Sequence, residues 1–127
     1  MAYIFKNNWG FSLAVDDNGK IAHQDRNEVR NGWEGFRIEY TNPKTCFISR
    51  EKGNNKIVLA IDDNGNVCTT GNRVKVGWEE FLITADSGKF MFSRVKAPHY
   101  TLAQDFNGKI CTTMNLQSNG WEGWTLK

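Results

Sequence analysis

Gly32-Trp33-Glu34-Gly35-Phe36-Arg37-Ile38 is the stretch that decides the fold of this chain, because it occurs three times. It returns as Gly77-Trp78-Glu79-Glu80-Phe81-Leu82-Ile83 and as Gly120-Trp121-Glu122-Gly123-Trp124-Thr125-Leu126. Successive copies lie 45 and 43 residues apart, so the repeat takes up the whole chain of 127 residues. Self-similarity at such a period indicates one structural unit that is built three times and shares a core with its neighbours.

A second landmark keeps the same phase, an Asp-x-Asn-Gly turn that follows a Leu-Ala pair in every copy. The three turns are Asp16-Asp17-Asn18-Gly19, Asp62-Asp63-Asn64-Gly65 and Asp105-Phe106-Asn107-Gly108. Asn and Gly tolerate positive φ, and an Asp side chain accepts hydrogen bonds from the amides that follow it. The sequence therefore predicts a hairpin in each repeat, with its second strand beginning at Ile21, Val67 or Ile110.

Apolar residues alternate with period two in each copy, as a strand with one buried face requires. Four short strands per repeat and no sustained helical period predict an all-β chain of twelve strands, a β-trefoil. We expect one domain over residues 1–127, with repeats at about 1–42, 43–86 and 87–127. A three-bladed propeller-like array is the alternative, although propellers typically have four or more blades.

Large apolar residues at repeat-equivalent positions are the natural core of such a small domain. The predicted core consists of Trp33, Trp78, Trp121, Leu13, Leu59, Leu102, Phe36, Phe81 and Trp124. The Glu that follows each repeated Trp is expected to accept a hydrogen bond from a neighbouring backbone amide.

The pattern aromatic-x-Leu-Ala-x-Asp-x-x-Gly-x-Val, followed by Gly-Trp-Glu-x-Phe, resembles the fascin-like branch of the β-trefoils, which includes the hisactophilins. The segment from Phe5 through Ala14 is similar to the opening of a hisactophilin repeat. The resemblance implies a trefoil fold and a cytoskeletal role. With only His23 and His99, the chain does not carry that family's histidine-driven pH response. It also lacks the Gln-x-Trp signature of ricin-type lectins.

Composition excludes several classes of function. A formal net charge of +2 with acids and bases mixed along the chain is too weak to predict nucleic-acid binding. No apolar run approaches the roughly 20 residues of a membrane-spanning helix. The N-terminal residues lead straight into the first repeat without room for a signal peptide, which predicts a cytoplasmic protein.

No constellation of residues predicts catalysis, a cofactor or a metal. Cys46, Cys68 and Cys111 cannot all pair, and the last two share a repeat position with Ala22, typical of a small buried apolar site. His23 with Asp25 is a surface dyad at most, and a solvated histidine is the simpler interpretation. The Asp-rich turns lack the EF-hand pattern, so a plain hairpin is preferred to a calcium site. We expect a binding protein and not an enzyme.

The first hypothesis is a carbohydrate-binding module with up to three shallow sites that act together. The informative residues are those that break the threefold pattern, Trp9 and Phe106, because a core needs equivalent residues and a ligand does not. Candidate ligand-binding residues are Asp16, Asp17, Asn18, Asp62, Asp63, Asn64, Asp105 and Asn107, with Trp9, Tyr100 and Phe106 as aromatic platforms.

The alternative hypothesis is binding to actin filaments, implied by the fascin-like resemblance and the unpaired cysteines. Basic loop residues would contact the acidic filament surface, although such charges more often form a solvated face. They are Arg26, Arg30, Arg50, Lys52, Arg73, Lys75, Arg94 and Lys96. A third hypothesis, a protease inhibitor or other protein-binding trefoil, has no loop that the sequence singles out. The oligomeric state stays open.

Overall fold

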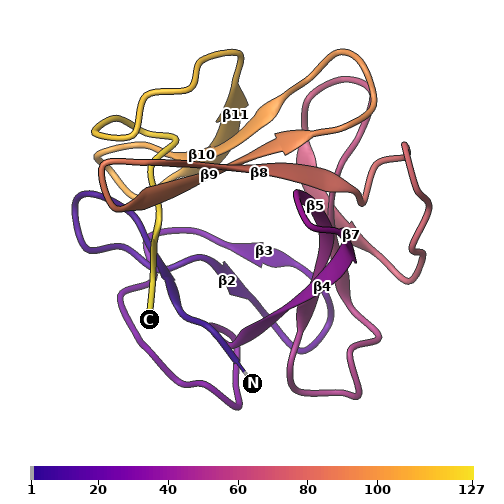
Figure 1. Ribbon diagram of the computed structural model, residues 1–127. Helices are drawn as coiled ribbons and strands as arrows, with labels where there is room; N and C mark the ends of the chain where they lie inside the picture. Colours follow the sequence, from indigo (N-terminus) through magenta and orange to yellow (C-terminus); the bar gives the residue numbers. More distant parts are fainter. Residues whose placement is uncertain (1) are drawn as a thin grey trace.

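The computed structural model describes residues 2–127, which form twelve short β-strands joined by turns and loops (Figure 1). The strands are β1 (Phe5–Lys6), β2 (Ala14–Val15), β3 (Ile21–Ala22), β4 (Phe36–Asn42), β5 (Thr45–Arg50), β6 (Val58–Ile61), β7 (Val67–Thr70), β8 (Phe81–Asp86), β9 (Lys89–Arg94), β10 (Thr101–Gln104), β11 (Ile110–Thr113) and β12 (Thr125–Leu126). Within this range no helix is long and apolar enough to cross a lipid bilayer.

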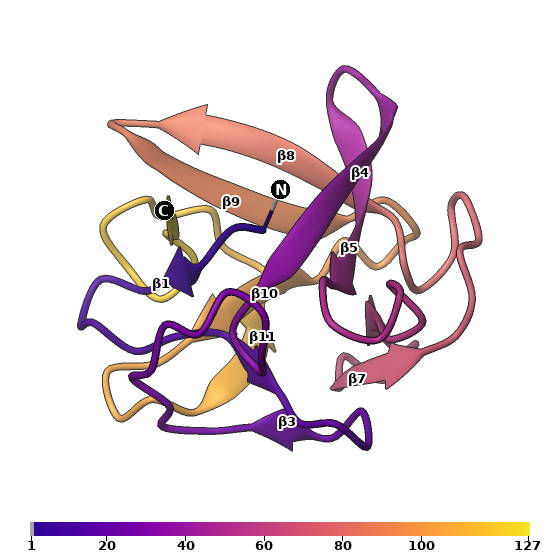
Figure 2. The same cartoon turned by 90° about the horizontal axis from the view of Figure 1, so that it is seen from below.

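The strands pair as antiparallel hairpins of two kinds. The pairs β4–β5 and β8–β9 are the long hairpins, and the third member of this set joins β12 to β1 from the two ends of the chain (Figure 2). The shorter pairs β2–β3, β6–β7 and β10–β11 carry the Asp-x-Asn-Gly turns. Three repeats of four strands in this arrangement are a β-trefoil, so the predicted fold is confirmed.

The core lies where the three repeats meet. Leu13, Leu59 and Leu102 have at most 1% of their surface exposed, as predicted from their repeat-equivalent positions. The ring of Phe5 packs against three aromatic rings: its centroid lies 5.8 Å from that of Phe36, 5.2 Å from Phe92 and 6.2 Å from Trp124. Each such buried side chain stabilises the fold by about 1.5–3 kcal/mol. The expected burial of Phe36, Phe81 and Trp124 is confirmed.

The prediction that the repeated tryptophans fill this core is wrong. Trp33, Trp78 and Trp121 expose 44%, 37% and 37% of their surface. Each lies in a turn ahead of the strand, which begins only at Phe36 and Phe81 in the first two repeats. The period-two pattern ends where the strand ends, so it does not govern a side chain in the preceding turn.

The hairpin predictions are confirmed, since β3, β7 and β11 begin at Ile21, Val67 and Ile110. The cysteine position differs from expectation, because Cys68 and Cys111 are half-buried and not fully buried. Cys46 is fully buried, and burial raises the pKa of its thiol to about 12.

Candidate functional site

Three shallow hollows lie at repeat-equivalent positions, and each contains one of the exposed tryptophans. We call them the first, second and third site, after Trp33, Trp78 and Trp121. Their cavity volumes are about 300, 430 and 510 Å³ respectively. A Gly, the Trp and the Glu of the Gly-Trp-Glu segment line each one, so the segment that organises the sequence also builds the surface.

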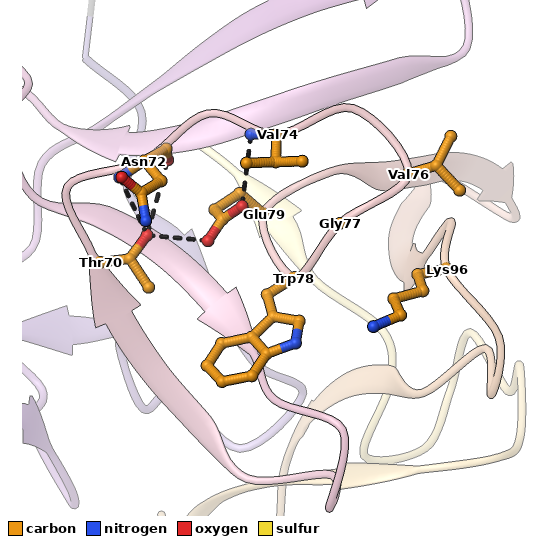
Figure 3. A pocket seen from close by; sticks show the side chains of 8 residues that line it. All are labelled: Thr70, Asn72, Val74, Val76, Gly77, Trp78, Glu79 and Lys96. Carbon is orange, nitrogen blue, oxygen red and sulfur yellow. Dashed lines mark hydrogen bonds between the residues drawn. The ribbon is translucent and has the colours of Figure 1, made fainter.

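The backbone of this segment is fixed while the indole stays outside. In the second site the amide of Gly77 donates to the carbonyl of Val74 at 3.1 Å, which closes a tight turn. The carbonyl of Trp78 accepts from the amide of Ile61 at 3.0 Å and so ties the turn to β6. The first and third sites make the same two contacts. The turn therefore holds the Trp by its main chain. The indole of Trp78 lies exposed at the hollow (Figure 3).

The Glu after the Trp takes the inward place that the sequence had suggested for the Trp. Glu79 is 3% exposed, and its carboxylate accepts from the amide of Val74 at 3.3 Å and from the hydroxyl of Thr70 at 2.9 Å. Glu34 and Glu122 accept from the amides five residues before them in the same way. The expected bond from this Glu to a nearby amide is confirmed, and it explains why the Trp is turned outward.

The first site differs in its acid chemistry. Asp25 lies eight residues before Trp33, the same distance at which Thr70 and Thr113 precede Trp78 and Trp121 and donate to the buried Glu of their sites. Burial, together with the neighbouring Asp25, raises the pKa of Glu34 to about 7. This site therefore holds a carboxyl group that takes up a proton near neutral pH.

Two of the three contacts between neighbouring repeats carry a buried arginine. Arg50 and Arg94 are at most 1% exposed, and their guanidinium groups lie 3.0 Å from the carboxylates of Asp17 and Asp63. The hydrogen bond from Arg50 lowers the pKa of Asp17, and bonds from Lys96, Trp78 and Arg94, in that order, lower the pKa of Asp63. These carboxylates are therefore held by cations of the protein itself.

The third contact replaces this pair with an amide and an aromatic ring. Asn7 occupies the position of the buried arginines, and Phe106 occupies that of the paired aspartates. The Asn7 amide nitrogen donates to the carbonyls of Gln104 and Asp105 at 3.4 and 3.2 Å, at the base of the turn that carries Phe106. Its oxygen accepts from the amides of Trp9 and Phe11 at 3.0 and 2.8 Å. One buried side chain thus fixes the Trp9 loop against the Phe106 turn.

Asn8 fixes the same loop against the Trp121 turn. Its amide nitrogen donates to the carbonyls of Ser118 and Gly120 at 3.0 and 2.8 Å. As a result Trp9, Phe106 and Trp121 form one surface cluster, with ring centroids 6.4 Å apart for Trp9 and Phe106 and 6.2 Å apart for Phe106 and Trp121. Both indoles line the third site.

The remaining candidate residues are the Asp and Asn residues of the hairpin turns, together with Tyr100, which directly precedes β10. The carboxylates of Asp16, Asp62 and Asp105 accept from the amides two and four residues further on, so they hold the turns. Asn18, Asn64 and Asn107 are exposed at the turn tips. Tyr100 is half-buried, with the Arg94 guanidinium 5.0 Å from its ring centroid, and does not stand free as a platform.

Most of the basic residues proposed for filament contact are engaged within the fold. Arg50 and Arg94 are buried, which contradicts their assignment to an exposed basic face. The guanidinium carbon of Arg26 lies 3.8 Å from the ring centroid of Phe11, and Arg73 pairs with Glu39 at 2.7 Å. Lys52 pairs with Asp17, and Lys96 pairs with Asp63.

The groups with reactive side chains are dispersed. His23 is exposed, and its ring Nδ1 accepts from the amide of Ile110 at 3.0 Å, so it is held by the backbone and not by Asp25. Over residues 2–127 no three His, Cys, Asp or Glu side chains are grouped so as to hold a metal ion.

Sequence reasoning missed Asn7, Asn8 and Trp121 as parts of the site. A usable signal for Asn7 was present, because an Asn stands there where the other repeats have Arg50 and Arg94.

No protein-family model and no curated protein matches the chain. Solved structures do resemble it. A GlcNAcα1-4Gal-releasing endo-β-galactosidase from Clostridium perfringens is similar over 98% of this chain, with a TM-score of 0.75 and 15% identity. The chain spans 31% of the length of that enzyme. A designed threefold-symmetric protein, ThreeFoil, is similar over 98% of this chain and 96% of its own, with a TM-score of 0.72 and 13% identity. At these identities the likeness shows the trefoil fold alone.

Proposed function

We propose that the protein is a non-catalytic carbohydrate-binding module whose repeated sites are the three hollows around Trp33, Trp78 and Trp121. The observation that carries this proposal is the exposure of a large aromatic residue at each equivalent position of a fold whose core does not need it. An exposed indole beside amide and hydroxyl groups suits a sugar ring, which has an apolar face and a polar edge. Small-molecule sites combine aromatic walls with a few placed polar groups in this way.

The repetition adds to the argument. Three weak sites on one rigid scaffold gain avidity when a branched or surface-bound glycan presents several copies of a sugar. The endo-β-galactosidase, of which this chain spans 31%, releases GlcNAcα1-4Gal according to its name. Glycans that contain this disaccharide therefore belong in the first set of ligands.

A glycan array followed by titration of intrinsic tryptophan fluorescence tests this function. Four of the five tryptophans, Trp9, Trp33, Trp78 and Trp121, are exposed, so a stacked sugar is expected to change their emission. The matched control is the triple variant Trp33→Ala, Trp78→Ala, Trp121→Ala, which should stay folded because these indoles lie outside the core. Retention of full glycan binding by this variant, or no response of the native protein to millimolar sugar, would contradict the proposal.

A further inference from the structure

We infer that the third site is the principal site and that it binds a neutral saccharide between Trp9 and Trp121. This inference rests on the proposed function and adds which hollow is used and what class of sugar it takes. It is supported by the contact between the first and last repeats, where Asn7, Trp9 and Phe106 replace the residues of the other repeats.

The third site has two indoles where the others have one. In the second site the neighbouring repeat contributes Lys96, which reaches toward Trp78 in Figure 3. In the third site the neighbouring repeat contributes Trp9 instead. Phe106 contacts both indoles by its ring and so supports them from between. Two aromatic walls bury more of a sugar ring than one, and aromatic residues carry a large share of the energy of binding surfaces.

Apart from the buried carboxylate of Glu122, the polar side chains of the third site are uncharged. Gln117 and Asn119 stand where the second site has Val74 and Val76, so amides replace apolar side chains at two equivalent positions. The side-chain amides of Asn115, Gln117 and Asn119 make no hydrogen bond within residues 2–127, and each can donate and accept. They are placed to bond hydroxyl groups on a sugar edge.

Charge favours a neutral ligand. No Lys or Arg of residues 2–127 lines the third site. Its one carboxylate, that of Glu122, accepts from Thr113 Oγ1 at 2.7 Å and from the main-chain amide of Gln117 at 3.3 Å. A charged sugar would enter without an opposite charge to meet it and would lose part of its hydration. The cavity of about 510 Å³ lies within the range of about 300–1,000 Å³ common for small-molecule sites.

The walls are also held in place before any ligand arrives. Asn7 and Asn8 tie the Trp9 loop to the two turns that carry Phe106 and Trp121 by side-chain bonds of 2.8–3.4 Å. A site that is already arranged loses less conformational entropy on binding, which raises affinity.

Isothermal titration with single-site variants tests the inference. The neutral probes are lactose, cellobiose and the GlcNAcα1-4Gal disaccharide, and the charged probe is N-acetylneuraminic acid. We expect Trp9→Ala and Trp121→Ala each to weaken binding of the best neutral probe at least tenfold. Trp33→Ala and Trp78→Ala should each weaken it less than Trp121→Ala does. Tyr40→Ala removes an exposed aromatic ring outside the three sites and should change it less than twofold. Phe106→Asp, which installs the residue found in the other repeats, should weaken it while leaving the unfolding midpoint nearly unchanged.

The two proposals fail in different ways. Equal losses from the Trp33, Trp78 and Trp121 variants, or preference for N-acetylneuraminic acid, would overturn the neutral third site and leave carbohydrate binding standing. No binding of any sugar would overturn both. Binding of a proline-rich peptide at Trp9 and Trp121, in place of sugar, would equally refute them.

Discussion

Replacing Asn7 by Ala should destabilise the protein more than any other change to a loop side chain near the third site. Asn7 is 4% exposed, and its side chain makes four hydrogen bonds to main-chain groups. The variant leaves the amides of Trp9 and Phe11 without the partner they have, and the second of these is buried. An orphaned buried polar group costs about 1–3 kcal/mol, and the loss of a further hydrogen bond costs about 1 kcal/mol. We therefore expect the free energy of unfolding to fall by about 2–4 kcal/mol.

Urea unfolding followed by circular dichroism measures this loss. Against a total stability of about 5–15 kcal/mol for a typical domain, the variant should remain folded in water. Asn8→Ala is the matched control, because Asn8 makes two bonds to carbonyls from a part-buried position. Its loss should cost about 1 kcal/mol. The reasoning is refuted if Asn7→Ala costs no more than Asn8→Ala, since burial and orphaned amides would then not decide the outcome.

Three further outcomes follow from burial, crowding and charge. Trp124→Ala should cost about 3–5 kcal/mol in urea unfolding and Trp78→Ala less than about 1 kcal/mol; the reverse order would place the wrong tryptophan in the core. Gly35→Ala should prevent folding, because its Cβ would lie 1.7 Å from a main-chain oxygen, whereas Gly71→Ala, with 3.8 Å, should express as a soluble control. The pKa of Glu34 is raised from 4.5 to about 7, so the folded state holds more protons between these values and stability should fall as pH rises through this window. Glu34→Gln should remove that fall, and identical pH slopes for the two proteins would contradict it.

The threefold architecture could be predicted because local signals agreed with one another. The Asp-x-Asn-Gly turns and the Leu-Ala pairs recur in phase, and both depend on backbone geometry that a sequence records directly. The position of Leu59 or Phe81 in the core follows from the same regularity, since equivalent places in three repeats share one interior.

The site could not be predicted in the same way. Whether Trp33 faces inward depends on where the strand begins, and that is decided by Glu34 reaching back to an amide five residues earlier. The joining of Trp9 to Trp121 depends on contacts between the first and last repeats, which no local pattern contains. The sequence marks Trp9 and Phe106 as departures from the repeat, and Asn7 as a replacement of the arginine of the other repeats. It does not show that these residues meet, because that depends on which carbonyls Asn7 and Asn8 bind.

The β1–β12 pair places the third site, unlike the other two, next to the point where the two ends of the chain are joined. Both ends of the chain meet there, with Ile4 and Lys127 exchanging amide–carbonyl bonds of 3.1 and 3.0 Å. Trp9 follows one of the joined strands, and Trp121 precedes the other. A sugar bound between both indoles would link the two sides of the β1–β12 pair. Pulling the two termini apart should therefore require more force when the sugar is bound.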